Sequence, residues 1–405
     1  MSAIRAIFAA LCFLGATTLP AAAQNNSYSQ VERGRYLVAL GSCQGCHTKP
    51  GEEPFAGGRG LETPFGIIYT PNITFENETG LGLWSKDDFW RAMHDGRRRD
   101  GARLYPAFPY PHFTKMPREE VDAVYDYLST LDPVKKQAPA TSLPFPFNQR
   151  FLLAGWNMLF FEKGAFRADP EKSAEWNRGA YIVEGPGHCA GCHTPKNLFG
   201  GDKKSRNLTG GNLEDWFAPD IRGGRNGGLE SWSVDDIAEF LGEGRNAHTA
   251  AFSTMAEVIA LSTQHLNEAD RRAIAIYLKD MDGEERPTPR AASEATMAAG
   301  REIYFDNCSA CHVSDGSGIP RFFAPLAGSG KVNAEDPTTV IRVILEGARA
   351  VPTKARPTPL TMPPFHWKLT DAQIADVANY VRQSWGNRGA PVSASAVREL
   401  REALR

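Results

Sequence analysis

Residues 43–47 read Cys-Gln-Gly-Cys-His, and the pattern returns as Cys-Ala-Gly-Cys-His at 189–193 and as Cys-Ser-Ala-Cys-His at 308–312. The surrounding sequence repeats as well, since Arg-Gly-Arg-Tyr-Leu-Val at 33–38 precedes the first copy and Arg-Gly-Ala-Tyr-Ile-Val at 178–183 precedes the second. A pattern that recurs together with its context indicates a repeated structural unit. We therefore expect three units of one kind along the chain.

Each copy matches the attachment signature of a c-type haem. In this signature the two thiols form thioethers with the porphyrin, and the adjacent histidine is the proximal ligand of the iron. The pattern therefore predicts three covalently bound haem c groups, each with its iron. The expected attachment residues are Cys43, Cys46, Cys189, Cys192, Cys308 and Cys311, and the expected proximal ligands are His47, His193 and His312.

Three other uses of these cysteines fit less well. A structural zinc site needs four ligands and usually combines two such motifs. A redox-active dithiol is usually single and lies in a βαβ context, and the sequence shows little strand-like alternation. Disulfides are common in exported proteins, but three repeated motifs that use every cysteine after residue 23 favour haem.

An electron-carrying haem also needs a sixth ligand, which is usually methionine. In the third copy the candidate is Met362, in a Met-Pro-Pro-Phe stretch, and in the second it is Met255. The first copy leaves two candidates, Met116 and His112. Aligning the last helices of the units places Met116 at an ordinary apolar position, so it is also a candidate core residue. Met93 lies within a helical pattern and is expected to pack.

Helical periodicity dominates the rest of the chain. Each unit ends with apolar residues at helical spacing, over 118–131, 267–278 and 370–381. Because strand-like alternation is scarce, we expect an all-α fold. Residues 393–405 form an amphipathic pattern that predicts a short helix fraying at the surface.

The N-terminus is typical of a cleaved secretory signal, with Arg5, an apolar run and three alanines ending at Ala23. Proline-rich stretches at 133–146 and 284–296 are expected to separate the units. The predicted organisation is a signal peptide at 1–23, unit one at 27–135, a linker with an apolar helix at 136–172, unit two at 173–283, a linker at 284–293, unit three at 294–390 and a tail at 391–405.

The charge composition gives no support for nucleic acid as a partner. The 405 residues include 45 Lys and Arg against 47 Asp and Glu, so the net charge of −2 gives no sign of nucleic-acid binding. The longest apolar run after the signal, 151–161, is too short to cross a bilayer. The segment 145–161 is therefore expected to be a packed connecting helix or, alternatively, a membrane or partner contact.

With these three motifs and the sequence that repeats around them, the chain resembles the tri-haem cytochrome c subunits of bacterial membrane-bound dehydrogenases for gluconate, sorbitol, fructose and alcohol. The resemblance rests on the stretches 34–47, 105–110, 173–181, 255–258 and 384–387. It implies three tandem class I cytochrome c domains and a catalytic dehydrogenase subunit that holds FAD or pyrroloquinoline quinone (PQQ). It also implies ubiquinone as the electron acceptor. Related subunits often have methionine where this chain has Phe108.

The sequence predicts an electron-transfer subunit that is not catalytic alone, because no G-x-G-x-x-G or other motif of a catalytic domain is found. We expect it on the periplasmic side of the inner membrane, bound peripherally, with ubiquinone or a soluble electron carrier as acceptor. One alternative is the electron-acceptor subunit of a molybdenum hydroxylase. Another is a haem enzyme, such as a peroxidase or a sulfur-compound oxidase, that uses unit one.

Overall fold

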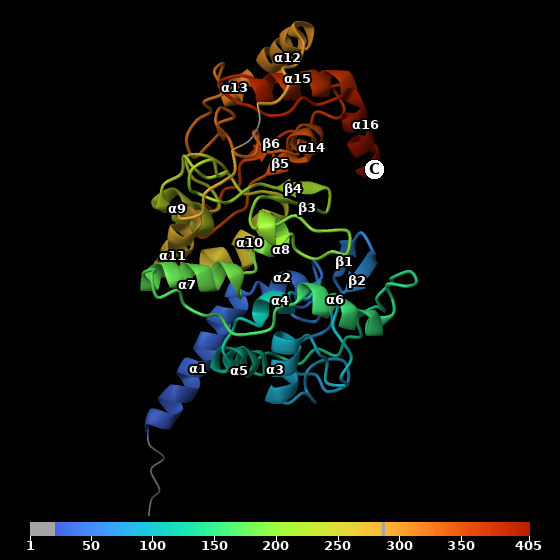
Figure 1. The fold of residues 1–405 in the computed structure, drawn as a ribbon, viewed down its shortest axis with the longest axis vertical. Helices are drawn as coiled ribbons and strands as arrows, with labels where there is room; N and C mark the ends of the chain where they lie inside the picture. Colours follow the sequence, from blue (N-terminus) through green and yellow to red (C-terminus); the bar gives the residue numbers. More distant parts are fainter. Residues whose placement is uncertain (1–20, 286–287) are drawn as a thin grey trace, which may run out of the picture.

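The computed structural model describes residues 21–285 and 288–405 and is mainly helical (Figure 1). Unit one lies in the lower part of this view, unit two in the middle and unit three at the top. Most of the predicted signal, 1–23, lies outside the described residues, so its cleavage stays a prediction.

Unit one begins with a long helix and ends with the predicted closing helix. Its elements are α1 (Ala21–Leu40), α2 (Cys43–His47), β1 (Gly60–Thr63), β2 (Gly66–Tyr69), α3 (Lys86–Asp95), α4 (Tyr110–Phe113) and α5 (Arg118–Leu128). Helix α3 starts with a capping box, in which the side chains of Ser85 and Asp88 each accept a hydrogen bond from the other residue's backbone. It ends at Gly96, whose φ of 61° is the left-handed conformation that favours glycine.

Unit two follows the same order of elements, whereas in unit three the hairpin comes after the middle helix instead of before it. Two short helices, η1 (Arg150–Leu152) and α6 (Leu153–Phe160), connect units one and two. Unit two contains α7 (Ala174–Glu184), α8 (Ala190–His193), η2 (Lys204–Arg206), β3 (Gly211–Leu213), β4 (Trp216–Ala218), α9 (Val234–Glu243), α10 (Ser253–Leu261), η3 (Thr263–His265) and α11 (Glu268–Lys279). Unit three contains α12 (Glu294–Asn307), α13 (Ser309–His312), α14 (Thr338–Glu346), β5 (Ala348–Arg349), β6 (Thr361–Met362), α15 (Asp371–Gln383) and α16 (Ala394–Ala403).

A glycine marks the crossing of the first and closing helices in every unit. A Cβ atom on Gly34 of α1 would lie 1.9 Å from the carbonyl oxygen of Ala123 in α5. The corresponding distances are 2.0 Å for Gly179 of α7, and 2.2 Å for Gly300 of α12. Such distances are far inside van der Waals contact, so only glycine lets the two helix backbones approach this closely. The same crossing recurs in all three units.

The expectation of an all-α fold needs one correction, because each unit also contains a small antiparallel sheet. The pairs are β1 with β2, β3 with β4, and β5 with β6. Each strand has only two to four residues. Alternation of apolar and polar residues cannot be recognised over so short a run, which explains why the sequence pattern missed the strands.

Units one and two are joined by reciprocal hydrogen bonds. Tyr36 of α1 donates to the carboxylate of Asp270 in α11 at 2.6 Å, and Arg178 of α7 donates to the same carboxylate at 2.6 and 2.8 Å. In the other direction, Tyr181 of α7 donates to Glu120 of α5. A tyrosine on the first helix of each unit thus donates to a carboxylate on the closing helix of the other unit. The two units also share one continuous hydrophobic core.

Acid is expected to weaken this junction. Burial alone raises the pKa of Asp270, but hydrogen bonds from Arg178 and Tyr36 outweigh it and hold the pKa below the ordinary value. A carboxylate with a lowered folded-state pKa stabilises the protein above its unfolded pKa of about 4, and this stabilisation is lost as the pH falls through the folded-state value. The Asp270→Asn variant should lose about 2 kcal/mol of unfolding free energy at pH 7. Denaturation at pH 7 and pH 3 measures this difference; a difference that does not shrink at pH 3 contradicts the assignment.

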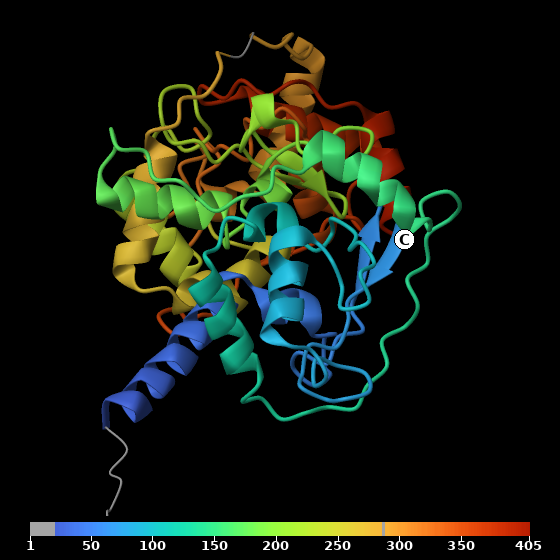
Figure 2. The same cartoon turned by 60° about the horizontal axis from the view of Figure 1, so that its bottom comes forward.

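The connecting segment, residues 136–172 between units one and two, runs along the hairpin β1–β2, as both ribbon views show (Figures 1 and 2). Ser142 pairs with Ile67 of β2, and the rings of Phe147 and Phe65 lie 4.9 Å apart. Nevertheless the side chains of Phe151 and Met158 remain 70% and 82% exposed. The segment is thus only partly packed and presents apolar side chains to its surroundings.

The C-terminal helix α16 is more firmly packed than the sequence pattern indicated. Val397 is fully buried against the core of unit three. Arg401 pairs with Asp371 at 2.7 Å and donates to the carbonyl oxygens of His366 and Leu369. Helix α16 is therefore an integral part of unit three. Within the described part of the chain, no helix has both the length and the apolar character that crossing a bilayer requires.

Candidate functional site

The histidines of the three repeated motifs have one environment in common. The Nδ1 atom of His47 lies 2.8 Å from the carbonyl oxygen of Pro71, and that of His193 lies 2.7 Å from the carbonyl oxygen of Pro219. In unit three, Nδ1 of His312 lies 2.9 Å from the carbonyl oxygen of Ala324. A carbonyl can only accept, so in each case Nδ1 carries the hydrogen. The Nε2 lone pair then remains available for a metal.

Burial keeps these imidazoles neutral. It lowers the pKa of His47, His193 and His312 below the ordinary value, and the hydrogen bond to the backbone carbonyl offsets only part of the effect. A neutral imidazole with a protonated Nδ1 is the form that binds iron through Nε2. The tautomer and the charge state therefore both suit a proximal ligand.

The cysteines are free thiols, of which five are partly buried and Cys311 is exposed. All six that lie in the described part of the chain are unpaired. Burial raises the pKa of Cys43 and Cys189 to about 12 and that of Cys308 to about 11. Redox-active cysteines have lowered pKa values, so these thiols do not resemble a catalytic dithiol. Among the described residues there is no group of three or more His, Cys, Asp or Glu side chains placed to hold a metal ion.

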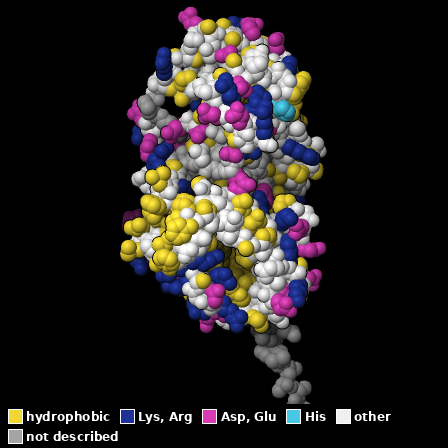
Figure 3. All heavy atoms as spheres, turned by 90° about the vertical axis from the view of Figure 1, so that its right-hand side faces the viewer, with side chains coloured by type: hydrophobic (Ala, Val, Ile, Leu, Met, Phe, Trp, Pro, Cys, Tyr) yellow, Lys and Arg dark blue, Asp and Glu magenta, His cyan; other side chains and the backbone are white. Residues whose placement is uncertain are grey.

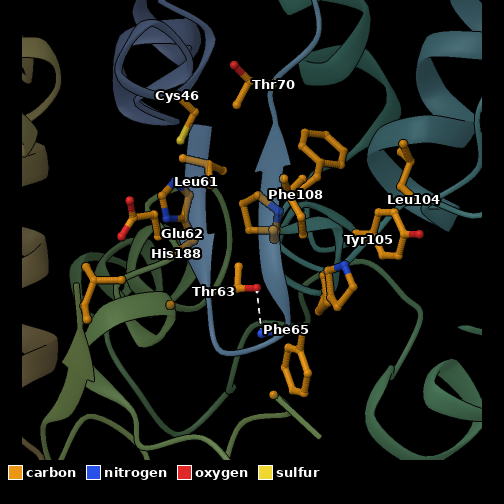
Figure 4. A pocket seen from close by; sticks show the side chains of 18 of the residues that line it. Cys46, Leu61, Glu62, Thr63, Phe65, Thr70, Leu104, Tyr105, Phe108 and His188 are labelled. Carbon is orange, nitrogen blue, oxygen red and sulfur yellow. Dashed lines mark hydrogen bonds between the residues drawn. The ribbon is translucent and has the colours of Figure 1, made fainter. Parts of the chain in front are cut away.

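An open cavity of about 3010 Å³ is lined by residues of all three units, among them Cys43, Cys46 and His47 of the first motif and Cys192 of the second. Figure 4 shows Cys46 from α2 on one side of the hairpin β1–β2 and Phe108 from the loop before α4 on the other. Apolar side chains such as Phe89 contribute to the walls. A haem requires thiols at one edge, an imidazole beside them and apolar surroundings, and the residues at this cavity fit that group.

The two candidates for the sixth ligand in unit one lie in different places. Met116 is 1% exposed and occupies the position two residues before its closing helix, as do the core residues Leu266 and Leu369. His112 lines the cavity, but its Nδ1 lies 3.1 Å from the carbonyl oxygen of Glu184 and its Nε2 lies 3.5 Å from Asp202. Both ring nitrogens of His112 thus face unit two.

The methionines expected in the other units lie between the middle helix and the closing helix of their unit. Met255 is on α10 and packs against the apolar cluster of Ala251, Ile259 and Val351. Met362 is half-buried in β6, where it pairs with Ala348. The assignment of each as a sixth ligand stays a prediction.

The motifs of units one and two lie close together. Burial raises the pKa of Cys192 to about 11, and Cys46 of unit one adds to this rise, so the two sulfurs are within electrostatic range. Arg59 of unit one pairs with Glu257 on α10 of unit two, with Nη2 2.9 Å from Oε2. His188 bridges the same gap, with Nε2 3.2 Å from the carbonyl oxygen of Gly41.

The sequence reasoning missed the carbonyl acceptors of the three histidines. A signal for two of them exists, because Thr-Pro-Asn at 70–72 and Ala-Pro-Asp at 218–220 occupy equivalent places in units one and two. In both places the Asn or Asp side chain accepts a backbone N–H two residues later, at 2.9 Å. This turn orients the preceding proline carbonyl toward the histidine.

Comparison with known proteins agrees with this geometry. The cytochrome c family model matches residues 297–385. The cytochrome c subunit of the quinone alcohol dehydrogenase of Gluconobacter oxydans (strain 621H) is 38% identical over 402 residues, covering 94% of this chain and 84% of the relative. The gluconate 2-dehydrogenase cytochrome c subunit of Pantoea cypripedii is 38% identical, covering 92% and 89%. The fructose dehydrogenase cytochrome subunit of Gluconobacter japonicus is 34% identical, covering 94% and 84%.

The matched segment and the Cys-x-x-Cys-His motifs define a protein with covalently bound haem. The chain belongs to the family of cytochrome c subunits of membrane dehydrogenases. Membership of this family supports covalent haem c, a role in electron transfer and a catalytic dehydrogenase subunit as partner.

Proposed function

We propose that this chain is a three-haem electron-transfer subunit built from three cytochrome c domains. It accepts electrons from a flavin- or PQQ-dependent dehydrogenase subunit and delivers them to ubiquinone or another respiratory acceptor. The observation that carries the proposal is the threefold recurrence of one arrangement. In each unit a Cys-x-x-Cys-His motif has its histidine Nδ1 at a backbone carbonyl, beside a helix pair that crosses at a glycine.

The residues of the chain have defined tasks in this proposal. The cysteine pairs attach the porphyrins, and His47, His193 and His312 supply the proximal nitrogen ligands. When bound, each haem supplies a one-electron carrier. The apolar walls exclude water and, with the axial ligands, set the reduction potential. No acid, base or nucleophile is needed, so the chain transfers electrons without converting a substrate.

The packing of units one and two supports direct electron exchange between their haems. Cys46 and Cys192 lie within electrostatic range of one another. The ion pair between Arg59 and Glu257 and the reciprocal tyrosine contacts hold the two units together. A rigid junction keeps the two attachment sites at a constant separation, which a fast transfer step between them requires.

The experiment is to mix the purified full-length protein with a candidate dehydrogenase and its substrate, and to follow haem reduction by visible absorption. We expect reduction within the turnover time of the dehydrogenase, and none when the substrate is omitted. Failure with every periplasmic dehydrogenase of the source organism would contradict the proposal. Peroxide turnover by the protein alone would instead support a haem enzyme.

We also propose that the mature protein lies on the periplasmic side of the inner membrane and touches the membrane through the connecting segment. Figure 3 shows hydrophobic side chains gathered over the lower half of one face, beside a hollow. Large apolar residues of the segment are among the most exposed in the described chain, namely Phe145, Phe147, Phe151, Met158 and Leu159. Exposed apolar patches of this kind mark contacts with membranes or partners.

Replacing Phe151 with aspartate is expected to weaken membrane binding, because a charge at an exposed apolar position opposes insertion into the interface. Sedimentation of the protein with vesicles of a bacterial phospholipid mixture measures the bound fraction. The matched control is Leu83→Asp, which places the same charge at an exposed apolar residue outside the connecting segment and should leave binding unchanged. Equal binding of the Phe151→Asp variant and the unchanged protein would exclude this contact.

A further inference from the structure

The cavity beside the first motif is lined by a methionine for which the sequence pattern predicted only a packing role. Of the methionines that the structure describes, Met93 alone lines this cavity, together with Cys43, Cys46 and His47. Met93 lies on α3 and is 5% exposed. Met93 and Met116 both belong to the hydrophobic core that units one and two share, but Met93 also borders the cavity that the attachment residues line, and Met116 does not.

The position of Met93 on α3 can be compared with the equivalent position on α9, because the two helices have the same length and the same caps. Both have ten residues, both start with a serine capping box, and both end at a glycine in the left-handed conformation. Met93 lies eight residues after Ser85, and Leu241 lies eight residues after Ser233. Met93 thus takes the place that an apolar core leucine takes in unit two.

The loop that follows shows the opposite exchange. Isolated bridges pair Arg97 with Arg103 in unit one, and the equivalent residues of unit two, Arg245 with Ala250. Five residues further along each chain segment lie Phe108 in unit one and Met255 in unit two. Unit two therefore has leucine on the middle helix and methionine five residues after the bridge, at the start of α10, whereas unit one has methionine on the middle helix and phenylalanine five residues after the bridge.

The side chains of Phe108 and Met93 differ in whether they can bind iron. Phe108 lines the cavity and packs against Phe113 with ring centroids 5.4 Å apart, but a phenyl ring has no lone pair with which to bind iron. Met93 has a thioether on three rotatable bonds, so it can adapt its position toward a metal. The rival His112 directs both ring nitrogens at unit two.

We propose that Met93, on the middle helix of unit one, is the sixth ligand of the first haem. In this assignment the ligand lies on the middle helix, and Phe108 stands at the sequence position that corresponds to Met255 of unit two. This inference rests on the proposed function, because it requires a haem attached to Cys43 and Cys46. It assigns the ligand that the sequence left open between Met116 and His112.

The test compares the spin state of the oxidised protein in several variants. Met93→Leu copies Leu241 of unit two, and we expect one of the three haems to become high-spin by electron paramagnetic resonance and to bind cyanide. Met116→Leu and His112→Gln are the matched controls and should remain low-spin. The double variant Met93→Leu with Phe108→Met copies unit two in full and should recover the low-spin state.

A second measurement does not depend on variants. Near-infrared magnetic circular dichroism of the unchanged protein distinguishes methionine from histidine ligation, and we expect three haems with histidine and methionine. The proposal is overturned if Met93→Leu stays fully low-spin, if His112→Gln becomes high-spin, or if the unchanged protein already has a high-spin haem. Covalent haem is counted by mass in every sample. A count below three in the unchanged protein refutes the three-haem function itself, whereas a count of three with a low-spin Met93→Leu variant refutes only the ligand.

Discussion

Replacing Cys189 and Cys192 with alanine is expected to leave two covalent haems instead of three. The reason is chemical, because alanine has no sulfur with which to form a thioether, and the remaining motifs at 43–47 and 308–312 are unaffected. Intact-mass measurement of the mature protein counts the haem adducts, and the haem absorbance per protein should fall by one third. The pair replaced lies outside the segment 297–385 that matches the cytochrome c family model, so the result tests unit two directly.

Two controls define the outcome. Replacing Cys308 and Cys311 should also remove one haem, whereas Cys12→Ala should change nothing, since Cys12 lies in the predicted signal. If the Cys189 and Cys192 variant retains the haem content of the unchanged protein, the assignment of three attachment sites is wrong. A mature protein that contains one haem before any replacement would contradict it equally.

Replacing Gly179 with alanine is expected to cost about 3 kcal/mol of unfolding free energy, the upper part of the range for overpacking a core. The added Cβ would lie 2.0 Å from the carbonyl oxygen of Ala273, and both atoms belong to helix backbones that cannot simply rotate away. Helices α7 and α11 must therefore separate, which also disturbs the contact between Arg178 and Asp270. Denaturant titration measures the loss.

The matched control is Gly155→Ala, because Gly155 also lies within a helix but has no atom near its Cβ position. There the substitution should be neutral or stabilising by up to about 1 kcal/mol, since alanine is the better helix former. A Gly179→Ala protein as stable as the Gly155→Ala protein would show that α7 and α11 do not cross at this glycine.

Local features of the fold could be predicted from the sequence. The closing helices were expected at 118–131, 267–278 and 370–381, and the structure has them at Arg118–Leu128, Glu268–Lys279 and Asp371–Gln383. Their apolar residues recur at helical spacing, a signal contained within a dozen residues. The short strands and the packing of α16 were missed, because a strand of two to four residues has no readable period and the burial of Val397 depends on distant helices.

Contacts between units could not be predicted. Tyr36 and Asp270 are 234 positions apart, and nothing in either local sequence indicates that they meet. The carbonyl acceptors of the histidines were likewise invisible, because every residue has a carbonyl and only the turn at Pro71 or Pro219 directs one toward an imidazole.

By itself, the sequence determined the chemistry of attachment, since the paired cysteines and the adjacent histidine act within five consecutive residues and need only a local helical turn. The tertiary structure alone decided which methionine shares a cavity with His47. Met93 and Met116 are both buried methionines of one hydrophobic core, but in the folded chain Met93 lines the cavity and Met116 does not. The physical reason is that side chains of one type are distinguished by their surroundings, and those surroundings come from segments distant in the chain.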